Sequence, residues 1–279
     1  MTTTDKYKPV ISATQLEMYW RCPESWRRRY VKKEIIPPGI ALLIGSGVHK
    51  GSHANFAQKI ESHVDLPAKE IVEAAVAGFE AEQAGGYVLT EEETGRGPGV
   101  VVGEAKDETV QLATLHAHSQ APAYQPVAAE LRINIPFPSA THDLVGFVDL
   151  IDALDRVVDI KTINKKPPAG IADESTQLTI YAAGFQRLYG RPACEVRLDF
   201  LRKQTKTMQP QRYVESSTRN EGDFRALINR INETLKAMNS GIFPPASPGA
   251  WQCSPKWCGY WSTCRYVNSE RRCAAERSE

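Results

Sequence analysis

The chain has 279 residues, 42% hydrophobic and 24% charged, which is typical of a globular protein with a sizeable core. Its formal net charge of +1 excludes no nucleic-acid partner, because acidic site residues can mask a local basic patch. The N-terminus lacks the apolar segment of a signal peptide, and no apolar run approaches the roughly 18 residues that cross a bilayer. We therefore expect a soluble, cytoplasmic protein that does not bind membranes.

The first part of the chain is predicted to be helical. Ser12 can cap a helix over "SATQLEMYWRC", where apolar residues recur at intervals of three and four. Further helical patterns cover residues 45–61, 67–84 and 107–121. Residues 85–105 are rich in glycine and acidic residues, so they are expected to form an exposed loop or insertion.

The middle of the chain changes from helical patterns to strands. Residues 128–137 alternate apolar and polar side chains with a period of two. The elements expected after this strand are strands over 143–154, 156–162 and 194–203 and helices over 175–190 and 220–241, the last ending at Gly241. This order predicts one α/β core with helical surroundings.

The stretch "GFVDLIDALDRVVDIKT", residues 146–162, places charged side chains within two expected strands. If the chain reverses in the polar turn between them, Asp149 lies roughly opposite Asp159 on the same face. Lys161 follows Asp159 by two residues and therefore shares that face. One hairpin would thus bring together two carboxylates and one ammonium group.

Two carboxylates held this close repel each other unless a cation lies between them. Mg²⁺ and Mn²⁺ prefer such oxygen ligands, often completed by phosphates, and a neighbouring lysine can position an attacking water. The pattern therefore indicates phosphodiester hydrolysis. The alternative is a hairpin with solvated acids, in which Lys161 simply pairs with Asp159.

The six cysteines are unevenly distributed along the chain. Without a secretion signal they are expected to be metal ligands or free thiols rather than disulfides. Three of them crowd the tail, at Cys253, Cys258 and Cys264, and Cys22 stands alone near the N-terminus. Four thiols suit either zinc or a cubane iron–sulfur cluster. Cys194 begins an expected strand and is predicted to be a small buried hydrophobe.

The ordered set of motifs resembles the PD-(D/E)XK nuclease superfamily and, more narrowly, the RecB-like exonucleases, which include CRISPR-associated and phage-encoded members. The matching residues, in the family's order, are Gly45 and His49, Glu130, Asp149, Asp159 and Lys161, and Gln177 and Tyr181. No single motif is specific, but together they span residues 45–181 in the right order. Asp159 stands where many members have glutamate, which leaves the metal preference open.

The resemblance implies a restriction-endonuclease-like fold: a mixed central sheet flanked by helices, with a helical N-terminal region and a Cys-rich C-terminal tail. Residues 1–279 would form a single nuclease domain. Within it, residues 1–125 would be mainly helical and carry the first cluster cysteine. Residues 126–205 would form the catalytic α/β core, and residues 206–279 the last helix and the iron–sulfur tail.

The resemblance also implies a DNA exonuclease that uses Mg²⁺ or Mn²⁺ and acts on single strands or duplex ends. The implied metal ligands are His49, Glu130, Asp149, Asp159 and the backbone carbonyl of Ile160. Lys161 would position the attacking water, with Gln177 and Tyr181 as supporting residues. Lys165 and Lys166 would contact DNA. The expected setting is recombination, repair or phage replication in a bacterial or phage-infected cell, with a recombination or replication protein as partner.

Some RecB-like members bind a 4Fe-4S cluster through one N-terminal and three C-terminal cysteines. This resemblance assigns the cluster to Cys22, Cys253, Cys258 and Cys264, with Cys273 as the substitute ligand. Zinc and unligated thiols remain open from the residues alone. So do two other functions: a catalytically silent DNA-binding or scaffolding subunit, and a zinc-dependent DNA-binding protein.

Overall fold

The computed structural model describes residues 8–137, 141–247 and 249–267, and Cys273 lies outside them. The chain forms two compact units. Unit 1 comprises Met1–Val10 and Pro37–Ile228, and unit 2 comprises Ile11–Ile36 and Asn229–Glu279. Two elements, β1 (Val10–Ser12) and α8 (Glu221–Asn239), begin in unit 1 and continue into unit 2.

A mixed β-sheet forms the centre of unit 1. Five strands of the sheet follow the order β2-β3-β4-β5-β6, in which β4 and β5 are parallel and the other neighbours antiparallel. Helix α7 (Thr176–Tyr189) connects the two parallel strands. The strands are β2 (Pro126–Ile135), β3 (Asp143–Asp152), β4 (Arg156–Ile163), β5 (Glu195–Arg202) and β6 (Gln211–Ser217). The predicted α/β class, a mixed sheet flanked by helices, is confirmed.

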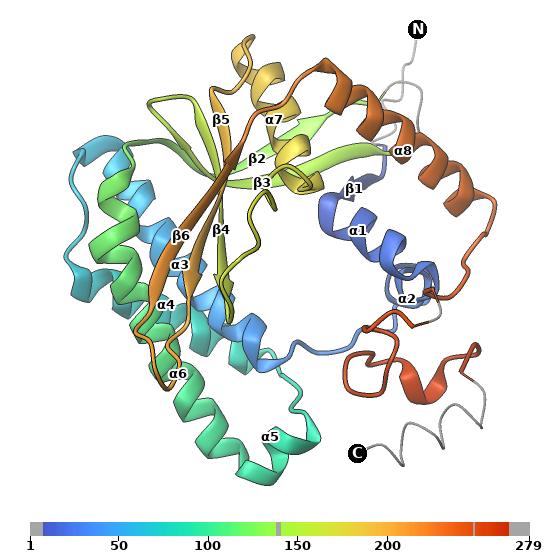
Figure 1. Ribbon diagram of the computed structural model, residues 1–279, viewed down its shortest axis with the longest axis horizontal. Helices are drawn as coiled ribbons and strands as arrows, with labels where there is room; N and C mark the ends of the chain where they lie inside the picture. Colours follow the sequence, from blue (N-terminus) through green and yellow to red (C-terminus); the bar gives the residue numbers. More distant parts are fainter. Residues whose placement is uncertain (1–7, 138–140, 248, 268–279) are drawn as a thin grey trace, which may run out of the picture. The chain divides into compact units, whose positions relative to one another are not determined.

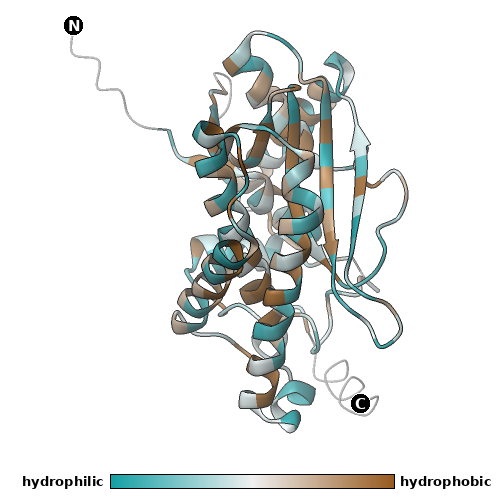
Figure 2. Ribbon diagram, turned by 90° about the vertical axis from the view of Figure 1, so that its left-hand side faces the viewer, coloured by the Kyte–Doolittle hydropathy of each residue, from teal (hydrophilic) through white to brown (hydrophobic). Residues whose placement is uncertain are grey.

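Helices α3 (Ile40–Ser62), α4 (Ala68–Ala84) and α6 (Pro98–Leu115) lie side by side next to the sheet (Figure 1). The hydrophobic core between them includes Phe56 of α3 together with Ile160 of β4. In the side view of Figure 2, brown hydrophobic stretches run along the inner strands of the sheet. Among the helices of the described chain, none combines the length and the apolar character needed to cross a bilayer.

The prediction of a loop over residues 85–105 is wrong. This segment contains α5 (Glu91–Arg96) and the first turns of α6, which begins with Pro98 at a position where proline is favoured. Thr90 and Glu93 form a capping box at the start of α5. Val101 and Ala105 are buried in the core, so the apolar residues of the segment form one face of a helix. The glycine and acidic content masked these capping signals.

Two further expectations differ from the structure near β5. Strand β6 is absent from the elements that the sequence predicts, although it pairs with β5 along its whole length. Cys194 precedes β5 and is exposed, so its prediction as a buried residue is wrong. The strand begins one residue later, at Glu195, so the Cys194 side chain is not among those that the strand buries.

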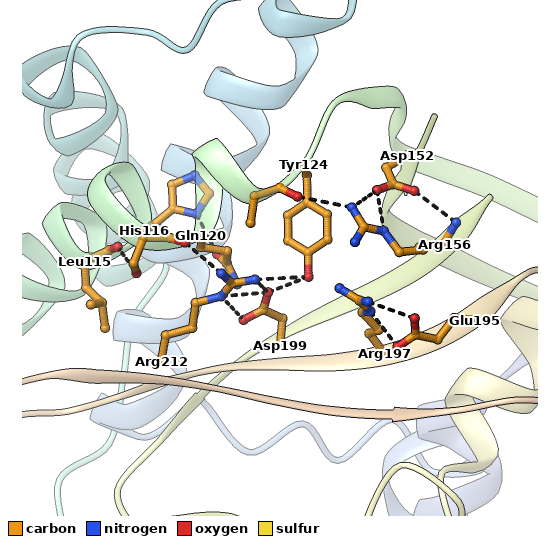
Figure 3. A network of polar contacts seen from close by, with 12 residues as sticks. Leu115, His116, Gln120, Tyr124, Asp152, Arg156, Glu195, Arg197, Asp199 and Arg212 are labelled. Carbon is orange, nitrogen blue, oxygen red and sulfur yellow. Dashed lines mark hydrogen bonds and ion pairs between the residues drawn. The ribbon is translucent and has the colours of Figure 1, made fainter. Parts of the chain in front are cut away.

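A buried polar network joins β5, β6 and the chain that follows α6 (Figure 3). Asp199, which is fully buried, accepts hydrogen bonds from the hydroxyl of Tyr124 at 2.7 Å and from Nη2 of Arg212 at 2.7 Å. The guanidinium of Arg212 also donates to the carbonyl of Ser119 at 2.7 Å. These hydrogen bonds hold the chain that follows α6 to β5 and β6, and they offset the cost of burying the charged groups.

His116 lies beside this network and should make stability depend on pH. The imidazole is fully buried, and its Nδ1 lies 2.6 Å from Oε1 of Gln120. Burial lowers its pKa to about 4, although Gln120 and the nearby carboxylates of Asp199 and Asp65 oppose the shift. In the unfolded chain the histidine pKa is about 6.5, so between pH 6.5 and 4 the unfolded state binds a proton that the folded state does not bind. The free energy of unfolding therefore falls as the pH drops through this range.

We expect this loss to reach roughly 3 kcal/mol, and about 2 kcal/mol of it between pH 6.5 and 5. Urea unfolding of the wild type and of His116→Gln at pH 7.5 and 5 measures it, since glutamine removes the titration. Equal pH dependence in the two proteins would contradict the assignment.

Unit 2 is built from the N-terminal helices, the end of α8 and the tail. Ser12 caps α1 (Ala13–Arg21) through the backbone N–H of Gln15, as the sequence predicts. The backbone at Gly241 has a φ of 71°, which allows the chain to turn at the end of α8. The tail is tied to α1 and α2 (Pro23–Trp26): the Tyr19 hydroxyl donates to the carbonyl of Ile242 at 2.6 Å, and the N–H of Glu24 donates to that of Pro244 at 3.2 Å.

Candidate active site

The β3–β4 hairpin brings the two predicted carboxylates together. The strands pair at Leu150 with Val158, and the next position in this register places Asp149 beside Asp159. The backbone N–H of Ile160 donates to Oδ2 of Asp149 at 2.7 Å. The Asp149 side chain thus takes the place of a backbone partner at the point where the two strands stop pairing.

The two carboxylates have different electrostatic surroundings. Burial raises the pKa of Asp159 to about 6; Lys161 opposes the shift and the charge of Asp149 adds to it. Burial also acts against ionisation of Asp149, but His49 and the N–H of Ile160 lower its pKa overall. Asp149 is therefore the more readily ionised of the two, and two anionic groups meet in a buried place.

His49 reaches this pair from α3. Its Nδ1 lies 3.4 Å from Oδ1 of Asp149. Burial lowers the pKa of His49, but the charge of Asp149, the hydrogen bond to Asp149 and the charge of Asp159 together raise it overall. Without a metal ion, the imidazole therefore offsets the charge of Asp149.

Lys161 is fixed between β4 and α7. Its Nζ lies 2.8 Å from Oδ2 of Asp159 and donates to Oε1 of Gln177 at 3.0 Å. Gln177 in turn donates from Nε2 to the hydroxyl of Tyr181 at 2.6 Å. A Cβ on Gly146 would lie 2.8 Å from Cε1 of Tyr181, so a side chain there would displace the tyrosine. The predicted Gln177 and Tyr181 thus lie in one chain of contacts with the ammonium group.

Glu130 lies in register beside Asp149, between the pairs of β2 with β3 on either side of it. Its carboxylate, however, faces α3, where Oε1 is 3.5 Å from Nζ of Lys50 and Oε2 is 3.8 Å from Nε2 of His53. Its φ of 46° is rare for a non-glycine residue and is typical of strained functional positions. Lys50 and His53 were not among the predicted site residues. The four-residue spacing of His49 and His53 on one helix face was the signal for the second histidine.

Lys165 and Lys166 are exposed residues that follow β4. The Nζ of Lys166 lies 6.0 Å from the ring centroid of Tyr213. They leave the strand that carries Lys161, and their ammonium groups are accessible to a phosphate backbone.

Two carboxylates and the backbone carbonyl of Ile160 are the hard oxygen donors that the hairpin offers to a divalent cation. Across the described ranges, no three His, Cys, Asp or Glu side chains gather into a complete metal-binding group. Mg²⁺ binds to many enzymes through one or two carboxylates with water and substrate phosphates. Asp149 and Asp159 are therefore the residues whose oxygen atoms fit a divalent cation. His49 and Glu130 lie next to Asp149.

In unit 2, the four cysteines named for a cluster line one cavity of about 140 Å³, together with apolar residues such as Ala246 and Val267. Burial raises the pKa of the Cys258 thiol; the backbone of Tyr260 opposes this shift, and the charges of the other three cysteines add to it. None of the five described cysteines forms a disulfide. The structure therefore brings together Cys22, Cys253, Cys258 and Cys264.

Comparison with known proteins identifies related sequences and folds. The family model of the PD-(D/E)XK nuclease superfamily matches residues 10–265. A structure from Eubacterium rectale, of a protein proposed to be an exonuclease, is 11% identical with a TM-score of 0.59, and the match covers 96% of this chain and 94% of that one. The structure of SSO0001 is 15% identical with a TM-score of 0.43, over 95% and 89% of the two chains. No curated protein matches the sequence. At 11% identity, the likeness to the Eubacterium rectale structure shows a shared fold.

Proposed function

Because the chain belongs to the PD-(D/E)XK nuclease superfamily, we propose that it is a metal-dependent DNA exonuclease of the RecB-like type. The observation that carries the proposal is the hairpin, which places Asp149 beside Asp159 and fixes Lys161 next to them. Unit 1 holds all of these residues, and the proposal treats residues 1–279 as one nuclease. DNA recombination, repair or phage replication is the proposed setting, in the cytoplasm.

A bound Mg²⁺ or Mn²⁺ would supply a charge that stabilises the phosphate oxygens and lowers the pKa of a bound water. Asp149, Asp159 and the Ile160 carbonyl would hold it, supported by His49 and Glu130. The Ile160 N–H orients the Asp149 carboxylate before any ligand binds. This hydrogen bond would keep one ligand of the metal ion in a fixed orientation.

Lys161 would direct the attacking water and offset charge that develops on the phosphate. This role needs a fixed ammonium group, and Gln177 supplies the fixation from α7. Tyr181 holds the amide of Gln177 in turn. Burial raises the pKa of Tyr181, so its hydroxyl keeps its proton and acts as a neutral hydrogen-bonding group. Lys165 and Lys166 would contact the phosphate backbone.

A 4Fe-4S cluster bound by Cys22, Cys253, Cys258 and Cys264 is the second part of the proposal. The donor set fits, because four thiols line one cavity with apolar walls. Four thiols also suit a single zinc ion, so the colour of the protein separates the two assignments. Brown colour in an anaerobic preparation supports this assignment, and a colourless zinc protein contradicts it.

The catalytic proposal is tested with anaerobically purified protein, Mn²⁺ and linear DNA labelled at either end, single-stranded and duplex. We expect short products to appear from an end of the linear DNA while closed circular DNA stays intact. Cleavage of circles would show an endonuclease. DNA binding without any cleavage in Mg²⁺ or Mn²⁺ would show a silent subunit and overturn the proposal.

A further inference from the structure

Unit 2 carries a strong excess of positive charge. Its sequence contains 13 Lys and Arg but only 7 Asp and Glu, a net +6, whereas unit 1 contains 21 and 26, a net −5. The near-neutral charge of the whole chain hides these two opposite values. A region with such an excess attracts polyanions.

Half of the basic residues described in unit 2 have no carboxylate partner. Five of the ten are in ion pairs with Glu24, Glu34 or Glu233. Within the described part of unit 2, the residues without an ion pair are Arg21, Arg29, Lys33, Arg230 and Lys256. Three of these cations lie near aromatic rings: Arg29 near Tyr30, Arg230 over Trp20, and Lys256 near Trp257. Unpaired cations beside aromatic rings are the combination that binds nucleic-acid strands.

Two large apolar side chains are exposed on the tail. Trp251 is 66% exposed and Trp257 is 60% exposed, and their ring centroids lie 5.5 Å apart at 87° to each other. The Nζ of Lys256 lies 5.7 Å from the centroid of Trp257. Gln252, next to Trp251, donates to the backbone carbonyl of Arg21 at 3.4 Å, which brings the backbone of this arginine beside Gln252. We call Arg21, Trp251, Lys256 and Trp257 the tryptophan platform.

We propose that the tryptophan platform binds the unpaired strand of DNA. Bases would stack on the two exposed indole rings, which accept any base because every base has a π-face. Lys256 and Arg21 would contact the phosphates between stacked bases. The net charge of +6 on unit 2 favours a polyanion such as nucleic acid as the partner. The proposal rests on the proposed function for the identity of its ligand, and it assigns DNA binding to residues outside the catalytic set.

Binding of fluorescently labelled oligo-dT to the intact protein, without divalent ions, tests the proposal by fluorescence anisotropy. Trp257→Ala should weaken binding by roughly fivefold or more, and the double variant with Trp251→Ala should weaken it further. Trp257→Phe keeps an aromatic face and should retain most of the affinity. Lys256→Ala should lower the slope of log affinity against log salt by about 0.7, the value for one phosphate contact on a single strand.

The matched control is Leu154→Ala, which removes another exposed apolar side chain, 64% exposed, from unit 1 and should change nothing. Blunt duplex DNA offers no open base faces, so its binding should change less than that of oligo-dT. Unchanged oligo-dT affinity in the double tryptophan variant would overturn the inference, as would equal losses for oligo-dT and blunt duplex. Hydrolysis of a small phosphodiester that needs only the catalytic residues separates the two proposals. That activity should persist in the tryptophan variants, and its absence in the wild type would count against the catalytic proposal alone.

Discussion

Asp159→Asn is expected to abolish DNA cleavage while the protein stays folded. The carboxylate at this position is 1% exposed and lies 2.8 Å from Nζ of Lys161, and in the proposed mechanism both groups act on the same phosphate. An amide keeps the shape but removes the charge that would hold a divalent cation. We expect the rate of cleavage of end-labelled DNA in Mn²⁺ to fall by roughly a hundredfold or more.

Asp155→Asn is the matched control. Asp155 lies in the turn of the same hairpin, makes a surface ion pair with Arg191, and has a φ of 57°, which asparagine tolerates well. This variant should cleave DNA at the wild-type rate. If Asp159→Asn retained more than a few per cent of the wild-type activity, the catalytic assignment of the hairpin would be wrong.

Thermal unfolding distinguishes loss of chemistry from loss of structure in the same variant. Burial raises the pKa of Asp159 even with Lys161 beside it, so the charged form is penalised in the folded protein, and a neutral amide of equal size relieves that penalty. Asp159→Asn should therefore unfold at the wild-type temperature or above it. A large drop in the unfolding temperature would indicate that the ion pair with Lys161 mainly stabilises the sheet.

The arrangement of the hairpin could be predicted from the sequence because its information is local. A polar turn between two apolar runs fixes the register, and the register decides which side chains share a face. Asp149, Asp159 and Lys161 therefore occupy the places that the pattern predicts. The contact of Lys161 with Gln177 depends on packing of α7 against β4, and only the resemblance to a family indicated it.

Other features depend on interactions that no short pattern contains. Strand β6 is half-exposed at the edge of the sheet, and its polar sequence forms a strand because β5 supplies the hydrogen bonds. The helical conformation of residues 98–105 follows from burial of Val101 and Ala105 against other helices, which outweighs the low helix propensity of the glycines. Contacts between elements that are distant in the sequence therefore determine the conformation of these segments.

Cys22→Ser is expected to remove the proposed iron–sulfur cluster and loosen unit 2. Cys22 lies between α1 and α2, and the other three thiols at its cavity belong to the tail. A cluster would therefore close a loop of roughly 230 residues, which removes several kcal/mol of unfolded-state entropy in polymer estimates, although measured gains are smaller. We expect loss of the visible absorbance, a lower unfolding temperature and faster proteolysis of the tail.

The loosening should stop short of complete unfolding, because other contacts also hold the tail. The Tyr260 hydroxyl donates to the carbonyl of Glu34 at 2.6 Å, and Nη2 of Arg28 donates to Oγ1 of Thr263 at 2.7 Å. Cys258→Ser should behave like Cys22→Ser, whereas Cys194→Ser replaces an exposed thiol of unit 1 and should leave colour and stability unchanged. Brown, fully stable Cys22→Ser protein would place the fourth ligand elsewhere, and Cys273→Ser would then be the variant that loses the colour.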